Sequence, residues 1–310
     1  MNTIPIAFAF DNNLVMPACV CLSSLMMNAK PDTFYDIFIL HSEKEDLRKE
    51  ELNKLPIYYN NCRIQYRTVG DVFDQAFEIR GITTPAYYRL LIPEIIPEYD
   101  KVIYADADII FRMDLSNLYA LDLGNNFVAA TKDLGLNIGE DGRKYIQSVV
   151  GLPLGRYLQS GFIMLNNRAI RQDGLVEQFK ELALRKLKYQ DQDILNLACG
   201  ERVLYLPAKY NMTDYSYYYA MREPSNLKGY ITSEELPTAL SSGNLHFNGH
   251  KPWKKYCVNF DIWWEYYRKS PYFDEKFYFE FFYSKLNELD QLSLWKRIKI
   301  LARYFIHGRK

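Results

Sequence analysis

Asp106 and Asp108 are the residues whose type and spacing most directly suggest chemistry, because they interrupt the apolar run from Lys101 to Phe111. In an extended strand, side chains two residues apart point to the same face, so the pattern predicts that both carboxylates reach one point. Carboxylate oxygens at the end of a buried strand suit Mg²⁺ or Mn²⁺ holding a diphosphate. A chain of this composition holds about one Asp-x-Asp pattern by chance, so a solvated acidic turn is the alternative reading of the pair alone.

The elements that must position this pair alternate between strands and helices and predict an α/β protein. Apolar stretches predict strands at 4–10, 35–41 and 63–69. Pro17 opens a predicted helix to Asn28, and a capping-box signature that begins at Ser42 predicts a second helix to about Lys54. Units of this kind favour right-handed crossovers and a doubly wound parallel sheet, whose ligands collect at the carboxyl ends of the strands.

Later segments extend the pattern and add polar candidates. Strands are predicted at 127–131 and 160–166, helices at 176–187 and 189–198, and a mobile loop at the glycine-punctuated segment 139–155. Asp191 and Asp193 lie at the start of the 189–198 helix, where Asp191 as N-cap and Asp193 in the first turn would stabilise the helix end. His246 precedes a turn that contains Gly249, His250 and Lys251; a single histidine of this kind is more often structural than a ligand.

The composition is that of a globular chain with one large domain and an appendage: 310 residues, 48% hydrophobic and 25% charged, which excludes disorder and coiled coil. The formal net charge is zero, but residues 295–310 carry six basic residues and no acidic one, so the tail is basic and the remainder acidic. No nucleic-acid partner is expected. The five cysteines lack the paired spacing of a zinc site, and we expect reduced thiols in the core.

The chain shows neither a secretory signal nor a stretch of about 18 apolar residues, which predicts a cytoplasmic protein without a membrane span. Near the C-terminus, Leu294, Ile298, Leu301 and Phe305 share one helical face, with the basic residues elsewhere. A basic amphipathic helix of this kind fits the anionic inner face of a cytoplasmic membrane. A helix that caps the domain and keeps its charges in solvent is the alternative.

Read together, these motifs resemble the family 8 glycosyltransferases, retaining enzymes with a GT-A fold that use sugar nucleotides. The family includes bacterial lipopolysaccharide galactosyl- and glucosyltransferases and, more distantly, glycogenin. The resemblance covers Ile4 to Trp253, with five motifs in the expected order. It implies a Rossmann-like mixed sheet flanked by helices, a catalytic domain at 1–257, and an aromatic-rich helical extension with a basic amphipathic tail at 258–310.

The resemblance also implies a metal site, in which His246 joins Asp106 and Asp108 as the third ligand. One imidazole beside two carboxylates moves the preference from Mg²⁺ toward Mn²⁺. The matching positions for the UDP-sugar donor are Ala9, Asp11 and Asn13 for uracil and ribose; Arg89, Gly249 and Lys251 for the sugar or diphosphate; and Ala107, Gln159 and Ser160 beside the donor.

Asp191 and Gln192 match the pair that lies beside the sugar ring, so the resemblance gives both, together with Arg89, a catalytic role. Gln192 is an amide and a poor nucleophile, which favours same-face attack within an ion pair; double displacement through Asp191 is the alternative. Three features depart from the family pattern, and one of them, Ala105 in place of a common leucine, concerns packing. Gln159 stands where asparagine is usual, one methylene longer, and the spacing from His246 to Lys251 is one residue shorter.

The function that the resemblance implies is retaining transfer of galactose or glucose from a UDP-sugar to a glycan or lipid-linked glycan, in lipopolysaccharide or other cell-surface polysaccharide synthesis. Two alternatives come from other classes of protein. A haloacid-dehalogenase-like phosphatase also has an Asp-x-Asp pair, but on its first strand. A non-catalytic glycan-binding protein could retain the same fold.

Overall fold

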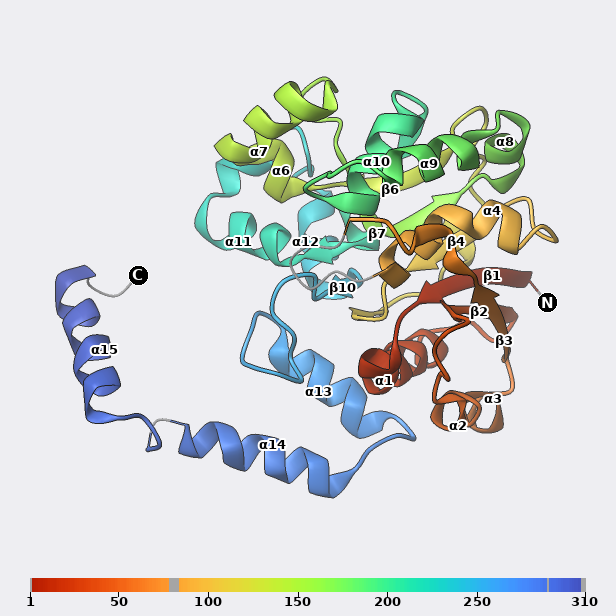
Figure 1. The fold of residues 1–310 in the computed structure, drawn as a ribbon. Helices are drawn as coiled ribbons and strands as arrows, with labels where there is room; N and C mark the ends of the chain where they lie inside the picture. The colour runs from red at the N-terminus through yellow and green to blue at the C-terminus, as the bar shows by residue number, and fades with distance from the viewer. Residues whose placement is uncertain (1, 78–83, 289, 308–310) are drawn as a thin grey trace.

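The computed structural model describes residues 2–77, 84–288 and 290–307, and its centre is a seven-stranded mixed sheet (Figure 1). The strand order is β3-β2-β1-β4-β7-β6-β8. β7 runs antiparallel to its neighbours β4 and β6, whereas the other pairs are parallel. The strands are β1 Asn2–Ala9, β2 Thr33–Ser42, β3 Cys62–Val69, β4 Val102–Ala105, β6 Val128–Lys132, β7 Leu158–Leu165 and β8 Val203–Tyr205. The predicted mixed α/β fold is confirmed, with the parallel arrangement limited to part of the sheet.

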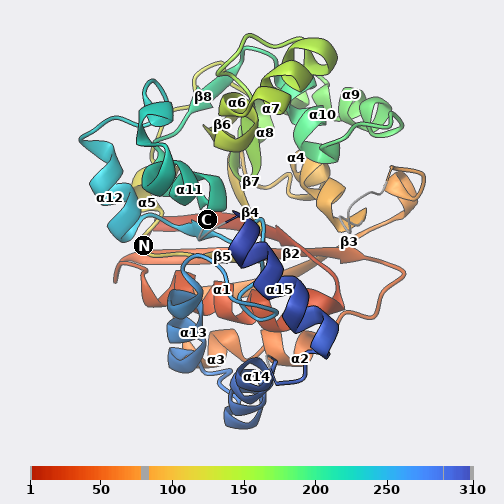
Figure 2. The ribbon, with the colours of Figure 1, turned by 90° about the vertical axis from the view of Figure 1, so that its left-hand side faces the viewer.

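Helices cover both faces of this sheet, as Figure 2 shows. One core lies between the sheet and α1 Val15–Met27, α2 Lys49–Leu52, α3 Leu55–Tyr58 and α5 Ser116–Tyr119. The other core lies between the sheet and the 3-10 helix η3 Thr84–Leu91, α4 Ile92–Ile95, α8 Asn167–Gln172, α9 Leu175–Ala183 and α10 Gln190–Cys199. The strands between two cores are therefore apolar on both faces, which is why they read as continuous hydrophobic runs in the sequence.

A second, three-stranded sheet has the order β5-β10-β9, with β5 Ile109–Ile110, β9 Met212–Thr213 and β10 Leu245–His246. The chain leaves the large sheet after Ala105 and enters the small sheet at Ile109. Asp106 and Asp108 therefore lie in the turn between two strands, and the prediction that they lie within one strand is wrong. The turn forms because β4 and β5 pair with different partners, β4 with β1 and β7, and β5 with β10.

Two other predictions are wrong for reasons of packing. Ser42 ends β2 in register with Val69 instead of capping a helix, and the Glu45 carboxylate accepts a hydrogen bond from the Asn12 backbone N–H, so the next helix begins at Lys49. The segment 139–155 contains α7 Glu140–Tyr145 and the π-helix η4 Ile146–Val150. A Cβ on Gly142 would overlap the backbone of Leu136, so this glycine permits close packing of α7 on α6 Leu134–Ile138.

The remaining helices lie around the small sheet and the edge of the large one. They are η1 Asn12–Leu14, η2 Asp71–Phe73, α6 Leu134–Ile138, η5 Ala208–Tyr210, α11 Asp214–Arg222, η6 Pro224–Leu227 and α12 Glu235–Ser242. All five cysteine thiols are free and four are buried, as predicted.

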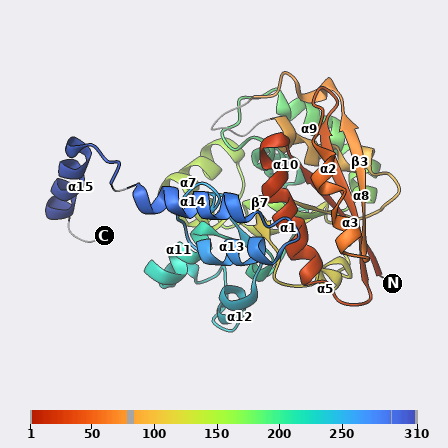
Figure 3. The ribbon, with the colours of Figure 1, turned by 90° about the horizontal axis from the view of Figure 1, so that it is seen from below.

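Three helices follow the small sheet: α13 Phe260–Lys269, α14 Glu275–Asn287 and α15 Leu294–His307. Trp263 and Trp264 of α13 are buried in one cluster with Val20 of α1 and Leu245 of β10. α14 packs through its aromatic side chains on Trp264, whereas α15 projects away from the body (Figures 1 and 3). In the described ranges, every helix is too short or too polar to cross a membrane. The proposed boundary after residue 257 therefore precedes a helix that packs on the preceding domain.

The two ends of this C-terminal region should differ in their contribution to stability. Trp264 is 1% exposed, and Trp264→Ala should lower the free energy of unfolding by about 3–5 kcal/mol because it leaves a cavity. Trp295 is 80% exposed, so Trp295→Ala is the matched control. This substitution should change the free energy of unfolding by less than about 0.5 kcal/mol. Urea unfolding followed by circular dichroism measures both. Equal effects of the two substitutions would show that α13 is not part of the domain core.

Candidate metal and nucleotide-sugar site

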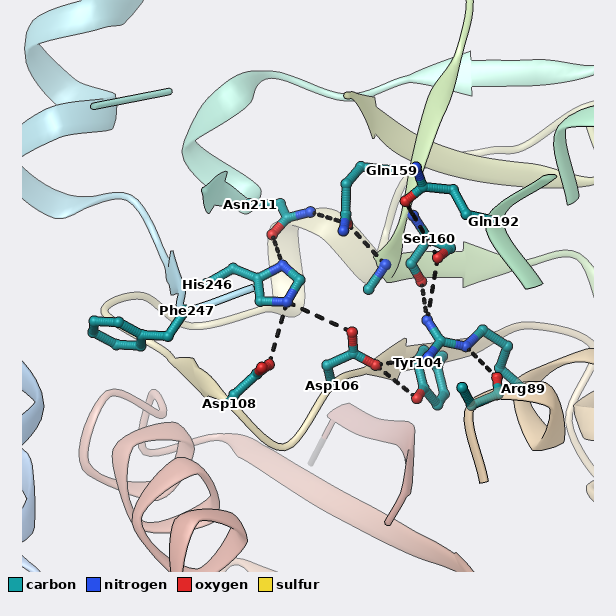
Figure 4. Close-up of polar contacts among 12 residues, drawn as sticks. Arg89, Tyr104, Asp106, Asp108, Gln159, Ser160, Gln192, Asn211, His246 and Phe247 are labelled. Carbon is teal, nitrogen blue, oxygen red and sulfur yellow. Dashed lines mark hydrogen bonds and ion pairs between the residues drawn. The ribbon is translucent and has the colours of Figure 1, made fainter. Parts of the chain in front are cut away.

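The structure brings Asp106, Asp108 and His246 together although 138 positions separate Asp108 from His246. β10 pairs antiparallel with β5, and this register places His246 opposite Ile109, directly after the aspartate turn. His246 Nε2 lies 3.2 Å from Asp108 Oδ1 and 3.5 Å from Asp106 Oδ2 (Figure 4). One ligand atom from each of the three residues lies within 4.8 Å of the others. The three side chains thus converge on one point.

The chemistry of this cluster fits a divalent cation. Asp108 Oδ1 and His246 Nε2 are buried, and neither makes a hydrogen bond of good geometry within the described residues. Burial opposes the charged forms of all three groups, but their ionic partners prevail. Arg89 and then His246 keep the pKa of Asp106 below its ordinary range, and Lys251 and then His246 do the same for Asp108. The two carboxylates raise the pKa of His246 to about 9. Two ionised carboxylates and an imidazole that converge on one point form a set of ligands suited to a divalent metal ion.

Arg89 comes from η3 and is buried against the same aspartates. Its Nη2 lies 2.9 Å from Asp106 Oδ1, its Nε lies 3.3 Å from Asp191 Oδ2, and its Nη1 donates to the Ser160 carbonyl at 2.7 Å. The guanidinium also lies 4.2 Å from the ring centre of Tyr104. Arg89 therefore joins the metal side of the site, at Asp106, to the α10 side, at Asp191.

Asp191 is not the N-cap of α10, so that prediction is wrong. Tyr189 occupies the N-cap position, and the Asp191 carboxylate instead accepts a hydrogen bond from Ser160 Oγ at 2.8 Å in addition to its ion pair with Arg89. Burial raises the pKa of Asp191 even though Arg89 lowers it. Asp193 does bond to the helix start, because its Oδ2 accepts from the Tyr189 backbone N–H at 2.8 Å.

Gln192 is held at both ends of its amide. Its Oε1 accepts from the Ser160 backbone N–H at 3.1 Å, and its Nε2 donates to Asp133 Oδ2 at 3.0 Å. Asp133 also caps α6 by accepting from the Leu136 backbone N–H. Sequence reasoning missed Asp133, but a signal existed, because Asp133 lies two residues after the strand predicted at 127–131, at the sheet edge where ligands collect.

Lys251 lies on the opposite side of the cluster. Its Nζ pairs with Asp108 Oδ2 and donates to the Phe247 carbonyl at 2.6 Å. Gly249 lies against Asp214, whose carboxylate would overlap a Cβ at that position, and the exposed His250 faces Asp214 through its backbone N–H at 3.4 Å. Asp214 is a second carboxylate that the sequence did not single out.

The residues predicted to contact the nucleoside lie at the same edge of the sheet. Ala9 ends β1 two residues after Ala7, which pairs with Tyr104 of β4, and so it lies beside the aspartate turn. The Asp11 carboxylate accepts from the Asn13 backbone N–H at 2.9 Å and thereby caps η1. The structure thus places Ala9 beside the aspartate turn by strand register, and Asp11 and Asn13 in the turn that follows β1.

Ala107, Gln159 and Ser160 occupy the interior of the site. Ala107 lies between the two aspartates and is buried in the core. Gln159 is buried, and its Oε1 accepts hydrogen bonds from Gly161 N–H and from Asn211 Nδ2. Asn211 in turn contacts His246 Nδ1, and nothing in the sequence around Asn211 indicated that role.

Comparisons with known proteins agree with this geometry. The sequence model of one family, described as glycosyl transferase family 8, matches residues 5–257. A putative glycosyltransferase of Haemophilus influenzae is 26% identical over 218 residues, which cover 68% of this chain and 64% of that protein. A lipopolysaccharide 1,2-glucosyltransferase of Escherichia coli is 27% identical over 217 residues, covering 68% of this chain and 62% of that protein. The chain thus spans a little under two thirds of the length of these two curated relatives.

A solved structure of the galactosyltransferase LgtC, in complex with donor and acceptor sugar analogs, superposes with a TM-score of 0.71. The identity is 25%, and the superposition covers 88% of this chain and 98% of that one. The mixed sheet with its flanking helices is therefore the GT-A fold that the sequence predicted.

Gly161 tests how tightly the cluster is packed. A Cβ at this position would overlap both His246 Cε1 and Asp106 Oδ2, so Gly161→Ala should push these ligands apart, lower the free energy of unfolding by about 1–3 kcal/mol and weaken Mn²⁺ binding. Urea unfolding and Mn²⁺ titration measure the two effects. Gly70→Ala is the control, since its nearest atom, Glu43 Oε1, would lie at an ordinary 3.5 Å. Wild-type stability and affinity in Gly161→Ala would contradict this packing.

Proposed function

This chain belongs to glycosyl transferase family 8, and from that premise we propose that it transfers a hexose from a UDP-sugar to a glycan acceptor with retention of configuration. The observation that carries the proposal is the convergence of Asp106, Asp108 and His246 at the carboxyl edge of the sheet. The phosphatase alternative is wrong, because the family match is to glycosyltransferases and the aspartate pair follows the fourth strand of the chain.

In this proposal the metal cluster and Lys251 bind the diphosphate of the donor. A bound Mn²⁺, with Mg²⁺ as the weaker alternative, would act as a Lewis acid toward the charge that develops on the leaving UDP. Lys251, which lies against Asp108, contributes a second positive charge at that point. Ala9, Asp11 and Asn13 contact the uridine, and Gly249 lets the backbone approach the phosphates.

Asp191 and Gln192 serve the sugar side of the reaction. The Asp191 carboxylate is held by Arg89 and Ser160, and the Gln192 amide is held by Ser160 and Asp133. Two groups held this firmly are suited to stabilise positive charge on a sugar ring and less suited to move onto its carbon as a nucleophile. This favours same-face attack by the acceptor hydroxyl, with double displacement through Asp191 as the alternative.

The donor sugar is galactose or glucose, and the acceptor is a glycan or lipid-linked glycan of the cell surface. The similar proteins support both parts, because one is a lipopolysaccharide glucosyltransferase and another is a galactosyltransferase. A panel of UDP-sugars, assayed for UDP release with Mn²⁺ or Mg²⁺ after chelation, identifies the donor. Absence of UDP release with every donor and both metals would support the glycan-binding alternative.

Replacing one ligand should remove most of the activity. Asp106→Asn keeps the size of the side chain but removes the charge that holds the cation, so UDP release should fall by about 100-fold or more. Asp100→Asn is the control, because Asp100 precedes the same strand at its other end and is largely exposed, in an ion pair with Arg171. Normal transfer by Asp106→Asn would show that the metal proposal is wrong.

We also propose that α15 binds the inner face of a cytoplasmic membrane, where a lipid-linked acceptor would be found. The helix has no acidic residue, it exposes Trp295 and Leu294, and it carries Lys296, Arg297, Lys299 and Arg303. Each basic residue near anionic lipid contributes about 1 kcal/mol to binding. The division into a catalytic domain at 1–257 and an extension at 258–310 is part of this proposal.

Deletion of residues 295–310 separates catalysis from membrane binding. The last three of these residues lie outside the described ranges. The shortened protein should hydrolyse UDP-sugar as the full chain does, but it should no longer sediment with vesicles that contain phosphatidylserine. Neutral phosphatidylcholine vesicles are the control for the electrostatic part. Unchanged sedimentation after the deletion would contradict a membrane role for α15.

A further inference from the structure

A chain of buried amide groups runs from the back of His246 to the strand that carries Gly161 (Figure 4). His246 Nδ1 lies 3.0 Å from Asn211 Oδ1, and Asn211 Nδ2 lies 2.6 Å from Gln159 Oε1. Gln159 Oε1 also accepts from the Gly161 backbone N–H at 2.8 Å. The Gly161 carbonyl then accepts from the backbone N–H of Asp106 at 2.8 Å, so the chain ends at a second member of the metal cluster.

The directions of the side-chain hydrogen bonds follow from one backbone donor, the N–H of Gly161. The Gly161 N–H can only donate, so the Gln159 atom that faces it must be the oxygen. That oxygen needs a donor from Asn211, which must therefore present its NH₂ group to Gln159 and its oxygen to His246. An oxygen can only accept, so His246 Nδ1 must carry a proton. Asn211 Nδ2 also lies 3.3 Å from Thr131 Oγ1, but a hydroxyl donates as well as accepts and sets no direction.

We propose that Gln159 and Asn211 lock His246 in the tautomer protonated at Nδ1, so that the Nε2 lone pair faces Asp106 and Asp108 and is available to a divalent cation. Both are positioning residues, since they act through His246. The inference rests on the proposed function only in taking the cluster to be a metal site. It gives Gln159 a role toward the metal ligand in addition to the donor contact that the resemblance implies.

The side chains of this relay, which is the hydrogen-bonded path from Gly161 through Gln159 and Asn211 to His246, are buried. Gln159 is 5% exposed, Asn211 3% and His246 2%, so water does not compete for these hydrogen bonds. The side-chain oxygen of Gln159 accepts hydrogen bonds from both Gly161 N–H and Asn211 Nδ2. Because groups that orient a metal ligand typically change metal affinity by about 10- to 100-fold, the effect of this relay on cation binding is large enough to measure.

The tautomer can be observed directly by ¹⁵N NMR of the histidine side chains, in metal-free protein without any sugar nucleotide. The chain has four histidines, so the signals can be assigned by substitution. Spectra recorded above about pH 10 report the neutral imidazole. We expect Nδ1–H for His246 in the wild type and in Gln159→Glu, whose oxygen accepts the same two hydrogen bonds. In Gln159→Leu, Asn211 is free to turn its NH₂ group toward His246, and the Nε2–H form should appear.

Metal affinity provides the second measurement. The dissociation constant for Mn²⁺, followed by electron paramagnetic resonance, should rise about 10- to 100-fold in Gln159→Leu. Asn166→Ala is the matched control: Asn166 is a buried amide just beyond the other end of β7, bonded to the backbone of Ala169 and Asn126, and its loss should leave Mn²⁺ affinity unchanged. Wild-type tautomer and affinity in Gln159→Leu would overturn the inference.

These outcomes are separate from those that test the proposed function. If the wild-type protein shows the Nδ1–H tautomer and binds Mn²⁺ but releases no UDP from any donor, the relay stands and the transferase proposal fails. If UDP release is Mn²⁺-dependent but Gln159→Leu keeps the wild-type tautomer and affinity, the transferase proposal stands and the relay fails.

Discussion

The carboxylates of Asp106 and Asp108 lie side by side in a partly buried position, where cationic groups surround them. A buried charge without a partner costs several kcal/mol, and two like charges cost more. Arg89 compensates Asp106, Lys251 compensates Asp108, and His246 faces both. These partners lie in η3, in the turn after β10 and in β10 itself. The ion pairs of two aspartates therefore connect parts of the chain that are far apart in sequence.

Much of the surrounding architecture positions these ion pairs. The small sheet forms after the chain leaves β4, where β5 pairs with β10. The register of this pair places His246 beside the aspartate turn. Gly161 has no side chain at the point where His246 and Asp106 approach most closely. Ser160, one residue earlier, presents its backbone and hydroxyl to Arg89, Asp191 and Gln192. Strand β7 thus connects the metal side of the site with the α10 side through neighbouring residues.

The C-terminal region shows how sequence composition and packing can diverge. Aromatic residues are dense from Trp263 to Tyr283, and the structure uses those of α13 to complete a core that includes Val20 and Leu245. The apolar residues of α15 are exposed, although their helical periodicity is just as clear. Periodicity indicates that a face is apolar, but whether that face meets the domain or another surface depends on where the preceding turns direct the helix.

The sequence by itself determined the α/β class and the positions of β1 to β3, because strand periodicity is a local property. It also indicated Asp106, Asp108 and His246 as candidate metal ligands, because the chemistry of a side chain is local too. The tertiary structure alone decided that the aspartates lie in a turn, that Ser42 stays in the sheet, and that 139–155 is helical, since each outcome depends on a partner far along the chain. It also decided that Asp191 pairs with Arg89 and that Asn211 and Gln159 support His246. Such roles are fixed by strand register, and register is set by contacts that no short segment contains.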